Sequence, residues 1–203
     1  MSGEAVWALV GLGLGVVMVR RRSVAVALVT GQAVVLVGVA LAHAKTGGDI
    51  IAAIALGARA AALATLLLLL VARSREARPV RAAVAPLARA GLAVGFALLL
   101  TWLVSITAVR SHVAYQAVLA LVAFGVATVV TRRATLFQVL GIVLVENGLA
   151  LAALTLPGGS SLVIELGVTL DLTLIALVAA LFHERIFAEF GAGDTAALRS
   201  LRD

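Results

Sequence analysis

The sequence predicts an all-α membrane protein, a polytopic bundle of about seven transmembrane helices. Of its 203 residues, 63% are hydrophobic and only 13% are charged, and the mean hydropathy is +1.17. Soluble domains are closer to one quarter charged. A chain of this length forms one or at most two ordinary domains, whose interiors are too small to bury so much apolar surface. Lipid must therefore solvate the remainder.

Long apolar stretches supply the individual spans, because about 20 apolar residues are needed to cross the hydrocarbon core of a bilayer. Their length, and the absence of short alternating segments, favours helices over the strands of an outer-membrane barrel. The longest polar stretch, residues 73–86, separates the third span from the fourth. The seven predicted spans are Ser2–Val19, Ser23–His43, Ile50–Ala72, Leu87–Val109, Val113–Val130, Leu136–Leu156 and Leu162–His183.

The distribution of cationic residues predicts the orientation. With the N-terminus outside, thirteen of the sixteen lysines and arginines fall in inner loops and the tail, and the others are Lys45, Arg110 and Arg59. Positive residues concentrate on the cytoplasmic side, so we expect an outside N-terminus and a cytoplasmic C-terminus. The net charge of +6 is thus a topology signal, and no nucleic-acid partner is expected. The thirteen are Arg20, Arg21, Arg22, Arg73, Arg75, Arg78, Arg81, Arg89, Arg132, Arg133, Arg185, Arg199 and Arg202.

The N-terminal region has an alternative interpretation as a cleavable signal peptide. Arg20–Arg22 are followed by an apolar run and by Ala42-His43-Ala44, which resembles a small-residue cleavage site. Against this, another apolar span precedes the arginines, and the run is longer than a typical signal core. We therefore expect this segment to remain as the second span.

The sequence offers no cofactor ligands. It contains no cysteine, which excludes disulfides, thiolate metal sites and cysteine-bound iron–sulfur clusters in this chain. The three histidines (His43, His112 and His183) stand at span ends and are too dispersed to indicate a haem or metal site. We expect no catalytic residue, no cofactor and no metal here, so any redox chemistry would belong to partner subunits.

Four ionisable residues lie inside predicted spans, where each is a functional hypothesis because burying a charge costs about 3 kcal/mol or more. Arg59 is near the middle of the third span and Glu146 near the middle of the sixth. Asp171 is near the middle of the seventh span, and Glu165 lies on the same span nearer the outer surface. Together they are candidates for a proton-transfer path.

These residues differ in what they can do. A guanidinium stays protonated, so Arg59 either locks helices together by pairing with an acid or tunes a carboxylate. Glu146 and Asp171 sit at similar depth on consecutive spans, and a buried carboxyl group can take up and release protons. Among the weaker polar signals, Gln32, Gln116 and Gln138 are expected to link helices, and Gly11, Gly13 and Gly15 to permit close helix contact.

Three motifs in the last third of the chain carry a family resemblance. They are Gln138-Val139-Leu140-Gly141, Val145-Glu146-Asn147-Gly148 and Val163-Ile164-Glu165-Leu166-Gly167-Val168-Thr169-Leu170-Asp171. Together they closely resemble the hydrogenase-4 component E family. The similarity is strongest over residues 131–203. Over residues 1–130 it rests mostly on the number of spans and on the central basic residue of the third.

The resemblance implies a small membrane subunit of group 4 [NiFe]-hydrogenase complexes, including formate-hydrogenlyase-type assemblies. Its last three helices are similar to the K subunit of respiratory complex I. Arg132 and Arg133 match an arginine pair of that subunit, and Asp171 matches its second buried acid. Val143 stands at the position of the first acid, and Glu146 lies one turn further on. The implied organisation is a four-helix membrane segment (1–111), a three-helix K-like segment (112–190) and a cytoplasmic tail (191–203).

The implied function is that of a non-catalytic subunit of a complex-I-like, proton-translocating redox complex, contributing Glu146, Asp171, Glu165 and Arg59 to a lateral proton relay. The partners would be antiporter-like large membrane subunits, a membrane anchor subunit and peripheral hydrogenase-like subunits, which would hold the [NiFe] centre and iron–sulfur clusters. The location would be a bacterial or archaeal cytoplasmic membrane. The alternatives are a subunit of a multisubunit cation/proton antiporter and a structural membrane spacer.

Overall fold

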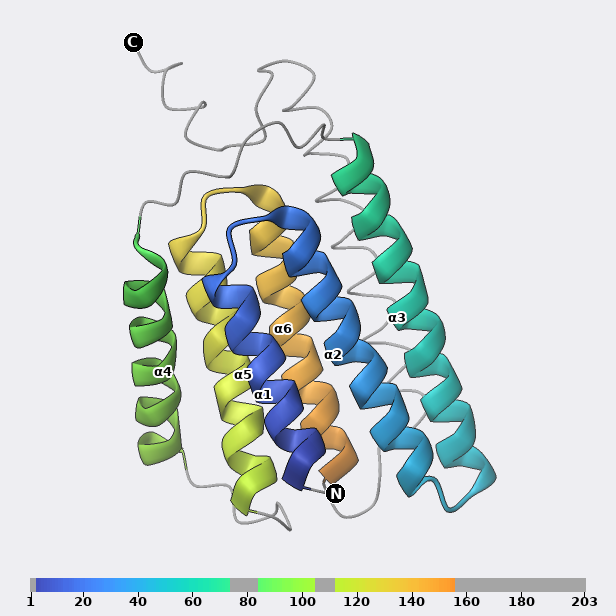
Figure 1. Ribbon diagram of the computed structural model, residues 1–203. Helices are drawn as coiled ribbons and strands as arrows, with labels where there is room; N and C mark the ends of the chain where they lie inside the picture. Colours follow the sequence, from blue (N-terminus) through green and yellow to red (C-terminus); the bar gives the residue numbers. More distant parts are fainter. Residues whose placement is uncertain (1–2, 74–83, 105–111, 156–203) are drawn as a thin grey trace.

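A computed structural model describes residues 3–73, 84–104 and 112–155, which form six α-helices and no strand (Figure 1). The all-α prediction is confirmed for these residues. The seventh predicted span, Leu162–His183, lies outside them. The helices are α1 (Gly3–Met18), α2 (Arg22–His43), α3 (Gly47–Arg73), α4 (Pro86–Leu103), α5 (His112–Thr131) and α6 (Thr135–Thr155).

Five of these helices, α2 to α6, are long and apolar enough to cross a membrane. The first helix, α1, is apolar but has 16 residues. At 1.5 Å per residue it extends about 24 Å, somewhat less than the hydrocarbon core of about 30 Å. The described part of the chain is therefore a bundle of apolar helices suited to a multi-pass membrane protein.

Two helix ends differ from the sequence prediction. Helix α3 begins at Gly47 instead of Ile50 because Thr46 and Asp49 cap it. The Asp49 backbone N–H donates to Thr46 Oγ1 (3.2 Å), while Asp49 Oδ2 accepts from the Thr46 N–H (2.9 Å), which is a reciprocal capping box. Helix α4 ends at Leu103 instead of Val109. Val104 has extended backbone angles, at the start of a stretch rich in β-branched residues that favour helix less.

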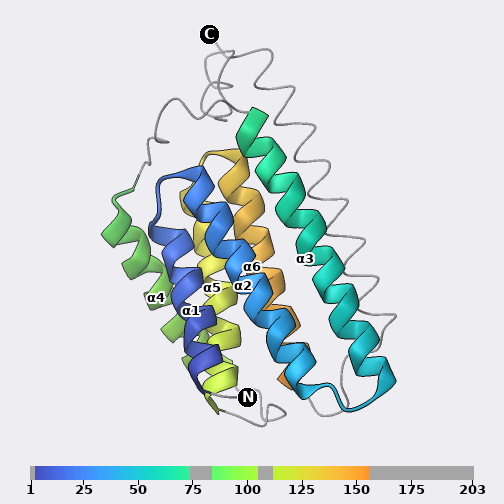
Figure 2. The ribbon, with the colours of Figure 1, turned by 45° about the vertical axis from the view of Figure 1, so that its right-hand side comes forward.

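Successive helices run up and down, so alternate connections lie at the same end of the bundle (Figures 1 and 2). One end of the bundle contains the α1–α2 and α5–α6 connections, together with the last residue of α3 and the first turn of α4. We call it the arginine end, because the α2–α3 connection at the other end carries a single cation, Lys45. The arginine end contains Arg20, Arg21, Arg22, Arg73, Arg89, Arg132 and Arg133.

The core of the bundle is centred on α5 and α6, whose backbones approach closely where Gly125 faces Gly141. A Cβ atom built on Gly125 would lie 2.5 Å from the Gly141 carbonyl oxygen, and one on Gly141 would lie 2.7 Å from the Gly125 oxygen. Helices α1 and α2 pack against this pair, and Gly13 brings α1 against Leu121 and Phe124 of α5. The expectation of close contact is confirmed at Gly13 and at Gly15, where a Cβ atom would lie 3.1 Å from the Leu28 side chain of α2, whereas Gly11 has open space beside it.

Helices from both predicted segments share this core. One cluster of buried side chains includes Val16 of α1, Leu67 of α3 and Ala93 of α4 together with Phe124 of α5 and Phe137 of α6. Residues 3–104 therefore do not pack separately from residues 112–155. The division at residue 111 between a four-helix segment and a K-like segment therefore stays a prediction from the family resemblance. Helices α3 and α4 are the most exposed of the five long helices, which suits contact with lipid.

Candidate functional site

A buried ion pair joins the middles of α3 and α6. The Arg59 guanidinium contacts a carboxylate oxygen of Glu146, and each side chain is only 6% exposed. Both residues lie well away from the ends of their helices. Arg59 therefore pairs with an acid, which is one of the two roles expected for it. The pair crosses between helices that are far apart in the sequence.

The other two acids predicted for the site, Asp171 and Glu165, lie outside the described residues. The expected approach of Asp171 to Glu146 therefore stays a prediction. Within the described part of the chain, Glu146 Oε2 is buried and has no hydrogen-bond donor. One carboxylate oxygen of Glu146 thus faces Arg59, and the other is left unsatisfied there.

A second polar contact begins at the residue after Glu146. The Asn147 side-chain amide donates to Gln32 Oε1 on α2 (2.8 Å), and the Gln32 amide donates to the Leu9 carbonyl on α1 (2.9 Å). Consecutive residues of a helix point about 100° apart, so α6 presents Glu146 to α3 and Asn147 to α2. Gln32 and Asn147 are almost completely buried. The expectation that Gln32 links helices is confirmed.

These contacts form a polar chain across four apolar helices: Leu9 on α1, Gln32 on α2, Asn147 and Glu146 on α6, and Arg59 on α3. We call these five residues the polar chain. Each hydrogen bond within it satisfies a side chain that would otherwise be costly to bury. The arrangement fixes the register of α1, α2, α3 and α6 at one depth.

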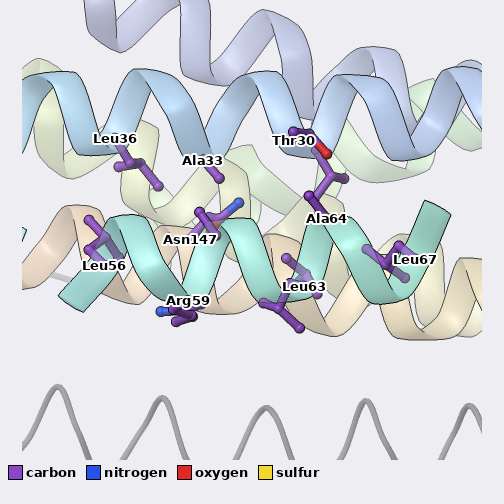
Figure 3. A pocket seen from close by; sticks show the side chains of 12 residues that line it. Thr30, Ala33, Leu36, Leu56, Arg59, Leu63, Ala64, Leu67 and Asn147 are labelled. Atoms are coloured by element: carbon purple, nitrogen blue, oxygen red, sulfur yellow. The ribbon is translucent and has the colours of Figure 1, made fainter. Parts of the chain in front are cut away.

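A small pocket lies beside the polar chain, between α2, α3 and α6 (Figure 3). Thr30, Ala33 and Leu36 of α2 point towards α3, and Asn147 lies behind α3 in this view. The pocket has a volume of about 20 Å³, which is sufficient for one water molecule. Arg59, Asn147 and Thr30 supply its polar lining. A water molecule there would lie next to Arg59 of the ion pair and Asn147 of the amide contact.

This geometry allows one kind of chemistry. A carboxyl group can exchange a proton with an adjacent water or acid, whereas a guanidinium keeps its proton and holds the carboxylate ionised. Among the described residues, no group of three His, Cys, Asp or Glu side chains comes together as a metal site. In the described residues the site thus pairs one ionisable carboxyl group, Glu146, with the permanently charged guanidinium of Arg59.

Two buried arginines at the arginine end were not identified as buried from the sequence. Arg89 and Arg132 were expected in cytoplasmic loops, but they are 0% and 3% exposed. For Arg89 the signal was present, because it stands three residues after Pro86, inside the predicted fourth span. For Arg132 no sequence pattern distinguishes it from the exposed Arg133 next to it.

Both arginines bind the carbonyl end of α1. Arg132 Nη2 donates to the carbonyl oxygens of Val17 (3.2 Å) and Val19, and Arg89 Nη2 donates to that of Met18 (3.5 Å). The Arg132 guanidinium also stacks on the Phe137 ring, 4.0 Å from its centroid. Cations are favourable at a helix C-terminus, where carbonyl groups are unpaired. These contacts tie α4 and α5 to the end of α1.

The fold and site define the class of this protein as a bundle of apolar helices, suited to a multi-pass membrane protein, with an ion pair buried between two of them. It is similar to an uncharacterized protein of Mycobacterium tuberculosis, Rv0085, with 33% identity over 90 residues, 44% of this chain. The match spans 41% of that protein's length. No family model and no solved structure matches the chain.

Proposed function

We propose that this protein is a non-catalytic membrane subunit of a complex-I-like, proton-translocating redox complex of the [NiFe]-hydrogenase type, related to the hydrogenase-4 component E family. The observation that carries the proposal is the Arg59–Glu146 ion pair, buried at the middle of two apolar helices. Burying charges at this depth is costly, so ionisable residues inside spans are candidates for a proton or ion path. The family motifs around Glu146 and Asp171 supply the second support.

In the proposed mechanism, Glu146 and Asp171 are successive proton-binding groups along a lateral path in the membrane plane. Glu165 is a further group on this path, nearer the outer surface. Arg59 holds Glu146 ionised until a charge nearby changes; Glu146 then takes up a proton and releases it when the charge returns. Electrons would travel through peripheral subunits holding the [NiFe] centre and iron–sulfur clusters. Antiporter-like subunits and a membrane anchor subunit would continue the path on either side.

The proposal includes seven spans in a bacterial or archaeal cytoplasmic membrane, with the N-terminus outside. We expect a Gly47→Cys variant to react with a membrane-impermeant thiol reagent from outside, and a Gly193→Cys variant only after the membrane is opened. Gly47 is exposed and has open space beside it, so cysteine fits there, and the chain has no other cysteine. Labelling of both sites from the same side would contradict the topology.

The function is tested by removing both charges of the ion pair at once. In the Arg59→Gln/Glu146→Gln variant no unpaired charge from the pair is left in the core, so the complex should still assemble. We expect proton translocation per electron to fall to less than half of the parent value in reconstituted vesicles, because no titrating group remains at that point on the path. Subunit content is measured in parallel.

The matched control is Glu4→Gln/Arg21→Gln, which removes one acid and one arginine at exposed positions and should translocate protons normally. Full pumping by the assembled Arg59→Gln/Glu146→Gln variant would leave the ion pair a structural contact. Sodium–proton exchange by the purified complex without redox turnover would support the antiporter subunit instead.

A further inference from the structure

The two buried arginines at the arginine end have more hydrogen-bond donors than partners. Besides the Nη2 atoms that bind α1, the Nε and Nη1 atoms of both Arg89 and Arg132 are buried without a hydrogen-bond acceptor. An unsatisfied buried donor is costly, and more so when it is charged. The two guanidinium groups hold four such nitrogen atoms, and a bound anion would accept hydrogen bonds from them and offset the cost of their burial.

The described residues supply no such anion. Their acids are Glu4, Asp49 and Glu146: the first two stand in the opening turns of α1 and α3, at the other end of the bundle, and the third pairs with Arg59. Burial, together with the positive charges of Arg89 and Arg20, lowers the pKa of Arg132 to about 10. The positive charges of Arg20, Arg89 and Arg132 thus repel one another at this end of the bundle. The Nε and Nη1 donors of Arg89 and Arg132 have no acceptor.

An apolar pocket lies between the same three helices that carry these contacts, α1, α4 and α5. Its volume is about 300 Å³, and its lining includes Val10 and Leu14 of α1, Val94 and Leu98 of α4, and Ala120 and Phe124 of α5. At 1.5 Å per residue, the α4 part of the lining, Val94 to Thr101, lies about 8 to 18 Å from Arg89 along the axis. One bilayer leaflet has a hydrocarbon depth of about 15 Å, so an acyl chain from a headgroup at Arg89 would reach the pocket.

We infer that the arginine end is a binding site for one anionic phospholipid, with its phosphate on Arg89 and Arg132 and an acyl chain in the apolar pocket between α1, α4 and α5. Guanidinium N–H groups donate strongly to phosphate oxygens, and Arg89 and Arg132 each have an Nε and an Nη1 donor without an acceptor. Basic pockets between transmembrane helices suit anionic headgroups. A free phosphate ion would fill the donors but leave the pocket unexplained. This inference does not depend on the proposed function.

The test measures lipid binding to the delipidated full-length protein by native mass spectrometry. Phosphatidylglycerol, phosphatidylcholine and inorganic phosphate are titrated separately. We expect one phosphatidylglycerol to bind with an affinity on the order of tenfold above that of phosphatidylcholine. In Arg89→Gln/Arg132→Gln this preference should fall to less than about twofold. The control Arg21→Gln/Arg133→Gln removes the same charge from exposed neighbours and should keep it.

A second variant covers the case in which the buried arginine variant does not fold. Ala120→Leu fills the pocket without changing any charge, and it should weaken phosphatidylglycerol binding while leaving binding of inorganic phosphate unchanged. Equal binding of the two lipids by the parent protein would overturn the inference. So would displacement of phosphatidylglycerol by an equimolar amount of inorganic phosphate, which would assign the site to a free anion. An equal loss of preference in both arginine variants would leave only a diffuse surface charge effect.

Discussion

Replacing Glu146 with glutamine is expected to destabilise the bundle by about 4 kcal/mol, and clearly more than replacing Arg59 with glutamine. Both changes break the same buried ion pair. The Glu146→Gln change leaves a guanidinium in the core, and that group cannot lose its proton at accessible pH. The Arg59→Gln change leaves a carboxyl group, which escapes the cost of a buried charge by taking up a proton. The order of the two effects follows from this difference.

Removing both charges should cost less than removing Glu146 alone, because no charge of the pair then remains in the core. Unfolding of the four proteins in mixed detergent micelles gives the double-mutant cycle. Glu4→Gln, at an exposed position in the first turn of α1, is the control and should change stability by less than about 0.5 kcal/mol. Additive single effects would contradict a coupled buried pair, and equal costs for both single changes would contradict the stated difference between leaving a guanidinium and leaving a carboxyl group in the core.

Gly125→Ala is expected to destabilise the protein by about 3 kcal/mol, although alanine is the better helix former. The added Cβ atom would lie 2.5 Å from the Gly141 carbonyl oxygen and 2.8 Å from the Val145 backbone nitrogen. These are backbone atoms of α6, so the clash is relieved only when α5 and α6 move apart. Gly141→Ala meets the Gly125 carbonyl oxygen at 2.7 Å and should behave alike.

Gly38→Ala is the matched control, since it stands within α2 and a Cβ atom there meets nothing within 4 Å. It should be neutral or slightly stabilising because alanine favours helix more than glycine. Stability is measured by the same micelle unfolding assay. The Gly125→Ala/Gly141→Ala double variant should cost less than the sum of the single changes, because the first already separates the helices. Unchanged stability of Gly125→Ala would contradict the close crossing of α5 and α6.

Much of the fold follows from hydropathy alone. Six of the seven predicted spans fall wholly or mostly in the described residues, and each overlaps a helix whose N-terminal residue is one to three positions from the prediction. The largest error at a helix start, at α3, came from overlooking Thr46 and Asp49, a capping box that the sequence displays. The late end predicted for α4 reflects how little hydropathy says about where an apolar helix stops.

The charged residues show where sequence reasoning reaches its limit. Arg59 and Glu146 were identified as buried because they stand in the middle of apolar runs, and a charge there is conspicuous. Arg89 and Arg132 were placed in loops because both stand near the ends of apolar runs. An arginine near a helix end can extend into headgroups or turn inward onto a neighbouring helix, and only the packing of α1 against α4 and α5 determines which.

The sequence by itself determined that the described residues form apolar helices, where those helices begin, and that Arg59 and Glu146 are buried, because these depend on local apolar length and on the cost of a charge in hydrocarbon. Only the tertiary structure decided which partners meet: Glu146 with Arg59, Asn147 with Gln32, and Gly125 with Gly141. These contacts join residues on different helices. Whether these contacts form depends on how each helix is rotated about its axis and shifted along it. In helices that are apolar all round, the periodicity of the sequence gives little indication of which face packs inward.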